Sequence, residues 1–372
     1  MKLEAFEMER MQSQWENRVS HNLSESGVHP MAVGDLLTPE EHQEIFRQRL
    51  VYVQSNGTPE LRAAIAALYH RATADNVVVT NGTAEANHIS IWRLVEPGDE
   101  VVMMLPNYMQ IWGLVRSLGA TIVPLPLREE NRWNLDPADL QKALTPRTRL
   151  IVVCNPNNPT GSILSSEGMK EVAALAARQG CWILSDEVYR GAEREGFETP
   201  SFWGLHDRVL VTSGLSKAYG LPGLRLGWTV GPVETIGELW ARKDYTTISP
   251  GALSDFLARK ALRPITRRRI LERTRDILRR NYPVLEAWVA RRGSAFGMVP
   301  PRAGAIAYLR YAWKLNSTDL AVRLRDEKSV LVVPGDHFGM DGYLRVGFGN
   351  EPEDLKAGLA RIDSLLDALG QP

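Results

Sequence analysis

A single lysine in the stretch SGLSKAYGLPGLRLGW, Ser213 to Trp228, is the first residue whose surroundings suggest chemistry. Lys217 follows small residues, and a Gly/Pro-rich loop that ends in Arg225 follows it. Glycine lets a backbone approach a bound molecule closely, and a guanidinium pairs well with phosphate or carboxylate. Taken alone, however, the stretch favours an exposed lysine among turn residues. Its interpretation therefore depends on what the chain places beside it.

The elements between Asn76 and Val230 predict the scaffold that positions this lysine. Short apolar runs alternate there with amphipathic segments, a rhythm typical of a mostly parallel sheet with helices on both faces. Ligands bind such sheets beyond the carboxyl ends of the strands, so the residues after each run are the candidates for function. The runs are VVVT, EVVMML, TIVPLPL, LIVVCN, CWILSD, VLVTSG and LGWTV, and the helical segments include 84–94, 110–118 and 166–179.

Functional side chains follow six of these strand ends. Each has a structural explanation of its own: a tight turn and helix cap, a core aromatic, a turn, a carboxylate paired with a structural arginine. It is improbable that an independent structural explanation of this kind holds at all six strand ends. The residues are Gly82 and Thr83 at a helix start, Tyr108, Asn158 in NPNNPTG, Asp186 with Tyr189 in SDEVY, Lys217, and Arg225.

One ligand has a feature for every member of this set. It needs an anion for the helix start and the arginine, a flat ring for the tyrosine, and a basic ring nitrogen for the aspartate. It also needs an oxygen for Asn158 and Tyr189 and a carbonyl for Lys217. Pyridoxal 5′-phosphate has all five features, so the residues predict this cofactor.

The motifs NPNNPTG, SDEVY, SGLSKAYGLPGLRLGW and YLRVGFG stand in an order that resembles the class I/II aminotransferases of the fold type I pyridoxal-phosphate enzymes. The resemblance covers nearly the whole chain. It implies a transaminase that moves the amino group of an α-amino acid to a 2-oxo acid through a Schiff base. It further implies a homodimer with shared active sites.

The resemblance also assigns roles. The catalytic residues are Lys217, Asp186 and Tyr189. The cofactor-binding residues are Gly82, Thr83, Ala84, Tyr108, Asn158, Asp186, Tyr189, Ser216, Lys217 and Arg225, with Tyr52 of YVQSNGTPELR and the segment 243–249 reaching the neighbouring subunit. The substrate-binding residues are Arg345, Asn158, Gly27 and His29. The chain departs from many relatives at Gly214, where they carry a phosphate-binding Ser or Thr.

Two alternative functions stay open. The stretches SGVHP, LSKAYGLPGLRLGW and KDYTTIS also resemble capreomycidine synthases, which implies a cyclase or lyase acting on an arginine-like amino acid. This narrower resemblance implies His29 and Lys243 as selectors of the side chain, with a loop histidine as the alternative for His29. A non-catalytic sensor that binds the cofactor is the other alternative. Such sensors are normally fused to a DNA-binding segment, and we expect no room for one here.

Composition limits the remaining possibilities. The chain has 372 residues, with 44 Lys and Arg against 44 Asp and Glu, so we expect neither nucleic acid nor membrane as a partner. Cys154 and Cys181 lie in apolar runs, which predicts free thiols and a cytoplasmic protein. We expect no metal site. The predicted fold class is α/β: an N-terminal arm that includes part of the small domain (1–45), a large domain (46–265) with a mostly parallel seven-stranded sheet, and a smaller α/β domain (266–372).

Overall fold

The fold is seen in a computed structural model that describes residues 3–372. Its main feature is a seven-stranded sheet in the order β2-β8-β7-β6-β5-β3-β4. The strands are β2 (Val77–Thr80), β3 (Glu100–Leu105), β4 (Thr121–Pro126), β5 (Thr148–Cys154), β6 (Trp182–Asp186), β7 (Val209–Gly214) and β8 (Gly227–Val230). Each of the seven predicted runs forms a strand, which confirms the predicted α/β class.

Most neighbours in this sheet run parallel, and β8 is the exception. It pairs antiparallel with both β2 and β7. The chain returns from β7 to β8 through the loop that carries Lys217, with no crossover helix, so the two strands must run in opposite directions. Lys217 is thereby held between two adjacent buried strands.

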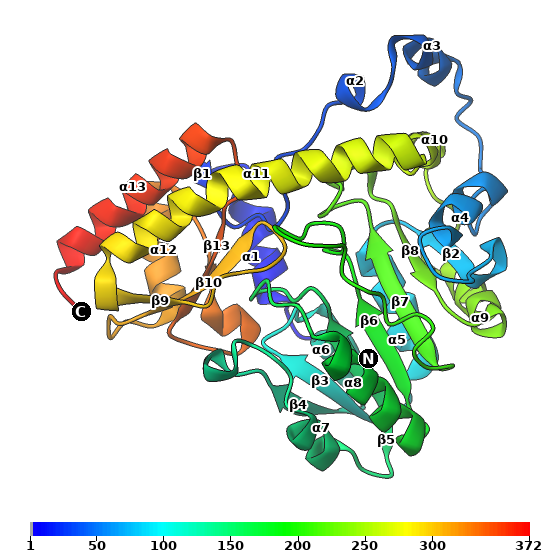
Figure 1. The fold of residues 1–372 in the computed structure, drawn as a ribbon, viewed down its shortest axis with the longest axis horizontal. Coiled ribbons are helices and arrows are strands. Elements are labelled where there is room, and N and C mark those ends of the chain that lie inside the picture. The colour runs from blue at the N-terminus through cyan, green and yellow to red at the C-terminus, as the bar shows by residue number, and fades with distance from the viewer. Residues whose placement is uncertain (1–2) are drawn as a thin grey trace.

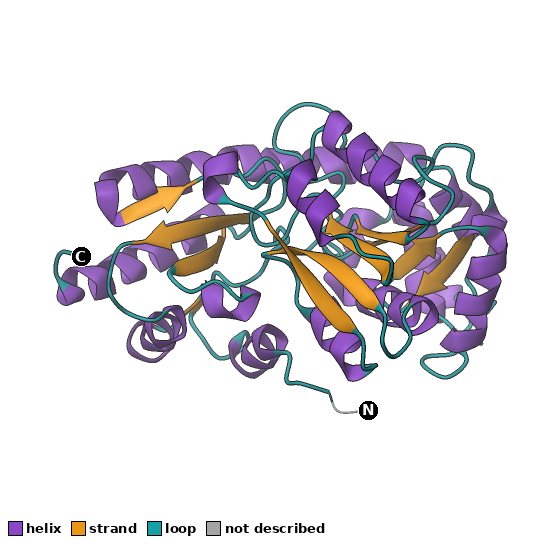
Figure 2. Ribbon diagram, turned by 90° about the horizontal axis from the view of Figure 1, so that it is seen from below, coloured by secondary structure: helices purple, strands orange, loops and turns teal. Residues whose placement is uncertain are grey.

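Helices cover both faces of the large sheet, as the turned view in Figure 2 shows. Those of this part of the chain are α4 (Pro59–Ala66), α5 (Thr83–Leu94), α6 (Gln110–Ser117), α7 (Pro137–Ala143), α8 (Ser166–Gln179), α9 (Val233–Lys243) and α10 (Ala252–Ala261). The pattern of residues 232–262 predicts one helical stretch, but the structure breaks it after Lys243. The intervening turn contains Ile248 at φ 65° and Pro250, neither of which continues a helix.

The long helix α11 (Pro264–Arg291) runs from the large sheet to a second unit (Figure 1). That unit contains an antiparallel sheet in the order β12-β13-β10-β9. Its elements are β9 (Phe296–Met298), β10 (Ile306–Tyr311), α12 (Ser317–Lys328), β11 (Val330–Leu331), β12 (Val333–Pro334), β13 (Tyr343–Gly347) and α13 (Pro352–Leu369). The 3-10 helices of the chain are η1 (Ala74–Asn76), η2 (Glu129–Asn131), η3 (Pro222–Leu224), η4 (Gly293–Ala295) and η5 (Gly335–Phe338).

The N-terminal segment folds back onto this second unit. It contains α1 (Glu7–Trp15), β1 (His21–Asn22), α2 (Val33–Leu36) and α3 (Pro39–Arg47), and β1 pairs in parallel with β11. The part that carries α2 and α3 then extends away from the body of the molecule (Figure 1). The domain boundaries stay a prediction.

Two further features bear on the expectations from composition. Cys154 and Cys181 are buried free thiols. Among residues 3–372, no helix combines the length and the apolar character that crossing a bilayer requires.

Candidate active site

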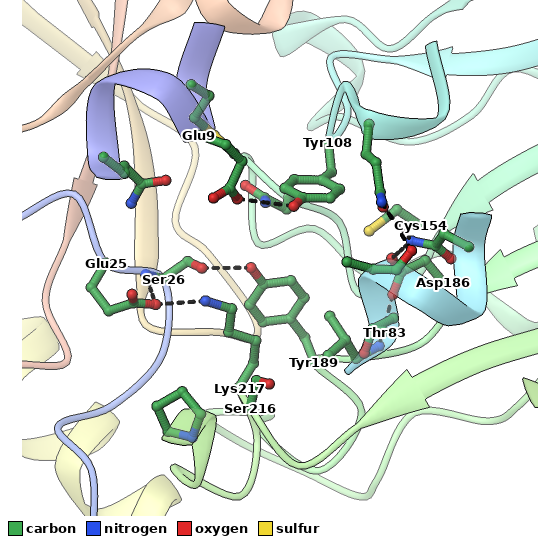
Figure 3. A pocket seen from close by; sticks show the side chains of 18 of the residues that line it. Glu9, Glu25, Ser26, Thr83, Tyr108, Cys154, Asp186, Tyr189, Ser216 and Lys217 are labelled. Carbon is green, nitrogen blue, oxygen red and sulfur yellow. Dashed lines mark hydrogen bonds and ion pairs between the residues drawn. The ribbon is translucent and has the colours of Figure 1, made fainter. Parts of the chain in front are cut away.

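A pocket of about 430 Å³ lies where the large sheet, the second unit and the N-terminal segment meet (Figure 3). Most of the predicted residues line it: Thr83, Ala84, Tyr108, Asn158, Asp186, Tyr189, Ser216, Lys217, Arg225 and Arg345. They come from strand ends and loops far apart in the sequence. The topology therefore brings together one amine, one buried carboxylate and two guanidiniums.

One end of the pocket is a cradle for an anion. The helix α5 begins at Thr83, and its N-cap Gly82 has φ 81°, a left-handed conformation that glycine adopts without strain. A Cβ at Gly82 would lie 2.5 Å from Nη2 of Arg225, so glycine is also required for the guanidinium to cross the helix start. The hydroxyl of Thr83 is buried with no hydrogen-bond partner. Unpaired amides, an arginine and an unused hydroxyl together favour a phosphate.

The same geometry accounts for Gly214, where many relatives carry a hydroxyl. A Cβ on Gly214 would lie 2.7 Å from Oγ1 of Thr83 and 2.9 Å from the carbonyl oxygen of Leu226. The space that a Ser or Thr would need is thus filled by the Thr83 hydroxyl. Thr83 and Ser216 are the hydroxyls that remain beside the anion cradle.

Asp186 is a buried carboxylate without a cation. It ends β6, is 6% exposed, and accepts hydrogen bonds from the Val188 amide (3.1 Å) and the Asn87 side chain (3.3 Å). Among the described residues it forms no ion pair, and burial raises its pKa to about 6. An uncompensated carboxylate at this depth calls for a positively charged ligand group.

Lys217 is held by a carboxylate that the sequence reasoning missed. Its Nζ lies 2.6 Å from Oε1 of Glu25, which also accepts hydrogen bonds from the amides of Ser26 and Gly27. Burial opposes the charge on both partners, but the attraction prevails: it raises the pKa of Lys217 and lowers that of Glu25 to about 2. Without a bound cofactor, the lysine is therefore an ammonium.

Arg345 provides the guanidinium at the side of the second unit. It lies on β13, is 1% exposed, and donates from Nη1 to Oδ1 of Asn158 (2.8 Å) and from Nη2 to the Ser24 carbonyl (2.5 Å). Its Nε has no partner. Tyr189 lies nearby and donates to the Ser26 hydroxyl at 2.8 Å; burial raises the pKa of this phenol to about 12.

Three predicted residues take other positions. Tyr52 is 85% exposed and does not line the pocket. His29 pairs with Arg273 (2.9 Å) and Glu351 (3.2 Å) outside the pocket. Lys243 is completely buried in its own chain, where its ammonium donates to Thr247 at 3.2 Å.

The residues that sequence reasoning missed come mainly from the N-terminal segment. Glu9, Glu16 and Glu25 all line the pocket, and Tyr108 donates its hydroxyl to Glu9 at 2.9 Å. Glu25 stands directly before the SGVHP stretch, so the only available signal was its closeness to Gly27. Nothing in the pattern of α1 distinguishes Glu9 from the other acidic residues of that amphipathic helix.

Fold and site together define an enzyme whose pocket pairs a reactive lysine with an anion cradle. The chain matches the model of the family "Aminotransferase class I and II" over residues 26–362, and it belongs to that family.

Named relatives agree with this assignment. The chain is 36% identical to capreomycidine synthase of Streptomyces vinaceus, over 93% of this chain and 89% of that protein. It is 29% identical to the aspartate/prephenate aminotransferase of Thermus thermophilus, over 89% of both chains. Among solved structures, a PLP-dependent aminotransferase from Streptococcus suis superposes with a TM-score of 0.93 at 31% identity, over all of both chains.

Proposed function

We propose that the protein is a pyridoxal-phosphate-dependent aminotransferase that moves the amino group of an α-amino acid to a 2-oxo acid. One observation carries the proposal: a primary amine, a buried carboxylate without a cation, and an anion cradle with unused donors line the same pocket. Membership of the aminotransferase family supports it.

The unused polar groups fit the cofactor. The Thr83 hydroxyl, the start of α5 and Arg225 suit its phosphate, with Ser216 as a second hydroxyl. Asp186 suits a protonated ring nitrogen, because a cation would remove the cost of its burial. Lys217 supplies the amine for an aldehyde, and Tyr108 supplies an aromatic face.

When bound, the cofactor withdraws electrons from the substrate and so weakens the bond between Cα and its hydrogen. Arg345 then binds the α-carboxylate, since its Nε is free to donate. Lys217, as a neutral amine, removes and returns the proton at Cα. Glu25 stabilises the ammonium form, so Lys217 must leave Glu25 before it accepts that proton.

A second candidate is a cyclase or lyase acting on an arginine-like amino acid, favoured by the 36% identity to capreomycidine synthase. Both functions use Arg345 for the carboxylate and Lys217 for the proton, and they diverge only afterwards. The non-catalytic sensor is the minor alternative.

A screen of amino acids without any 2-oxo acid separates these functions. We expect the holoenzyme to lose its visible absorbance with its substrate and to release one 2-oxo acid per site, because the amino group stays on the enzyme until an acceptor arrives. Rapid-scan absorbance and quantification of the 2-oxo acid measure this. Repeated turnover without acceptor, with release of ammonia or a cyclised product, would support the second candidate; binding without any product would support the sensor.

We further propose a cytoplasmic homodimer in which Tyr52 reaches the neighbouring subunit's cofactor phosphate. Large apolar side chains in residues 46–52, at and just after the end of the projecting helix α3, are largely exposed: Phe46 81%, Leu50 80% and Tyr52 85%. Tyr245, in the segment 243–249, is 83% exposed as well. Such surfaces are typical of protein interfaces.

Subunit mixing tests the shared site. We expect a solution mass of two chains, and weak cofactor binding in Tyr52→Ala and in Lys217→Ala separately. In a mixed dimer, one site combines the intact Lys217 of one subunit with the intact Tyr52 of the other. If every dimer is mixed, about half of all sites should therefore bind the cofactor with wild-type affinity. Fluorescence titration with the cofactor measures this. A monomer that binds tightly, or mixtures without recovery, would contradict the shared site.

A further inference from the structure

The N-terminal segment brings more negative charge to the pocket than the proposed function uses. Glu9 lies on α1, Glu16 directly after it, and Glu25 in the loop after β1, and all three line the pocket. Figure 3 shows Glu9 and Glu25 on the side of the two tyrosines away from Asp186 and Thr83. These carboxylates therefore lie apart from the residues assigned to the cofactor.

The positive charges of the pocket are all assigned. The basic side chains that line it, among the described residues, are Lys217, Arg225 and Arg345. The proposed function uses them for the cofactor carbonyl, the phosphate and the substrate α-carboxylate. Among the described residues of this chain, no lining cation is left for a second carboxylate, such as that of an aspartate or glutamate side chain.

Of the three carboxylates, Glu25 pairs with Lys217 and Glu9 accepts from Tyr108, whereas the charges that act most strongly on Glu16 are those of its negative neighbours. The side chain of Glu16 makes no hydrogen bond or ion pair with any described residue, and burial together with repulsion from Glu25 and Glu9 raises its pKa. A cation among the three would relieve that repulsion.

An independent observation shows that the same pocket awaits a ligand. Arg345 is 1% exposed, yet its Nε has no hydrogen-bond partner. An unpaired donor at that depth is costly unless a ligand anion binds it. The pocket thus offers an unused donor for a carboxylate, and an excess of carboxylates for a cation.

We propose that Glu9, Glu16 and Glu25 form a cation-binding subsite, so that the amino acid substrate carries an ammonium or guanidinium at the end of its side chain. This inference rests on the proposed function. It narrows the substrate class from α-amino acids in general to basic ones.

Glu25 links this subsite to Lys217. Its Oε1 contacts the lysine at 2.6 Å, so a substrate cation that takes over Glu25 removes the contact that stabilises the ammonium of Lys217. The lysine then becomes a neutral amine at lower pH. A basic side chain would in this way prepare the residue that moves the proton at Cα.

Binding of a charged and an uncharged isostere tests the proposal. L-Arginine and L-citrulline have nearly the same shape, but only arginine carries a positive charge. We expect the holoenzyme, without any 2-oxo acid, to bind arginine or ornithine at least tenfold more tightly than citrulline. The readouts are the change in visible absorbance during titration and the rise in unfolding temperature.

Two single variants locate the subsite. Glu9→Gln and Glu16→Gln should each weaken the binding of the basic amino acids by about tenfold and leave citrulline within about twofold, because each removes one charge and little volume. Glu7→Gln is the matched control, since Glu7 is exposed on the same helix and does not line the pocket. A variant is included only if its circular dichroism and cofactor absorbance match those of the wild type. One variant that meets this condition is enough to test the subsite.

The possible results separate the two proposals. If arginine and citrulline bind equally, if the variants weaken both alike, or if aspartate is the preferred substrate, the subsite is wrong and the aminotransferase proposal stands. If no amino acid of any charge alters the absorbance or yields a 2-oxo acid, the proposed function itself fails.

Discussion

Replacing Lys217 by alanine is expected to abolish turnover and the visible absorbance of the bound cofactor together. The substitution removes the only primary amine that lines the pocket among the described residues. No other lining side chain supplies both the bond to the cofactor and the base for the Cα proton. Loss of a proton-transferring group alone costs roughly 10²- to 10⁴-fold in rate, so activity should fall at least that far.

Two further variants make the result specific to the amine. Lys217→Arg keeps a cation beside Glu25 but has no primary amine, so it should fold like the wild type and be equally inactive. Lys170→Ala removes an exposed lysine of α8 and should be fully active. Steady-state rates and absorbance spectra measure these effects. A Lys217→Ala protein that still forms a borohydride-stabilised adduct with the cofactor would disprove the assignment.

The large sheet could be predicted from local sequence because most of its strands are buried on both faces. β2, β5, β6 and β7 each contain a run of at least three apolar residues, and such runs are visible without any knowledge of the fold. The break between α9 and α10 could have been predicted, because Pro250 and Gly251 are residues that interrupt helices. Only the backbone shows that Ile248 takes a left-handed conformation.

The pocket residues that lie at the strand ends of the large sheet could also be predicted from local sequence. Asp186 ends one predicted strand and Lys217 lies three residues after another, and parallel topology brings the ends of such strands together. Glu25 could not be predicted, because 192 residues separate it from Lys217, and its segment reaches the pocket through tertiary contacts such as the pairing of β1 with β11. Contacts of that kind depend on tertiary packing and leave no periodic signal in the sequence.

Replacing Asp186 by asparagine is expected to lower turnover by about 10²- to 10³-fold, the range found when a preorganised electrostatic partner is removed. The asparagine keeps one oxygen that can accept from the Val188 amide, so the local fold should persist. It loses the charge that favours a protonated ring nitrogen. The rate of the single turnover without acceptor, and the Kd of the cofactor, separate the loss of chemistry from weaker binding. Near-normal rates would mean that this carboxylate is not the partner of the ring.

The same substitution should stabilise the protein when no cofactor is added. Burial raises the pKa of Asp186 from 3.8 to about 6, so the folded state binds a proton more tightly than the unfolded state. The ionised carboxylate therefore costs up to about 3 kcal/mol above pH 6, and that cost disappears as the pH falls from 6 towards 4. At pH 8 the cofactor-free Asp186→Asn protein should have the larger free energy of unfolding, and the difference should vanish near pH 4.

Buried Glu187, with a pKa raised to about 7, titrates in both proteins, so the difference between the two urea-unfolding curves isolates Asp186. The control is Asp207→Asn, because Asp207 is exposed. This substitution should leave the free energy of unfolding unchanged at both pH 8 and pH 4. Saturating cofactor should reverse the order, because only the wild-type carboxylate gains a cation on binding. If Asp186→Asn were the less stable protein without cofactor, Asp186 would have a stabilising partner in the fold and would not be waiting for the charge of a ligand.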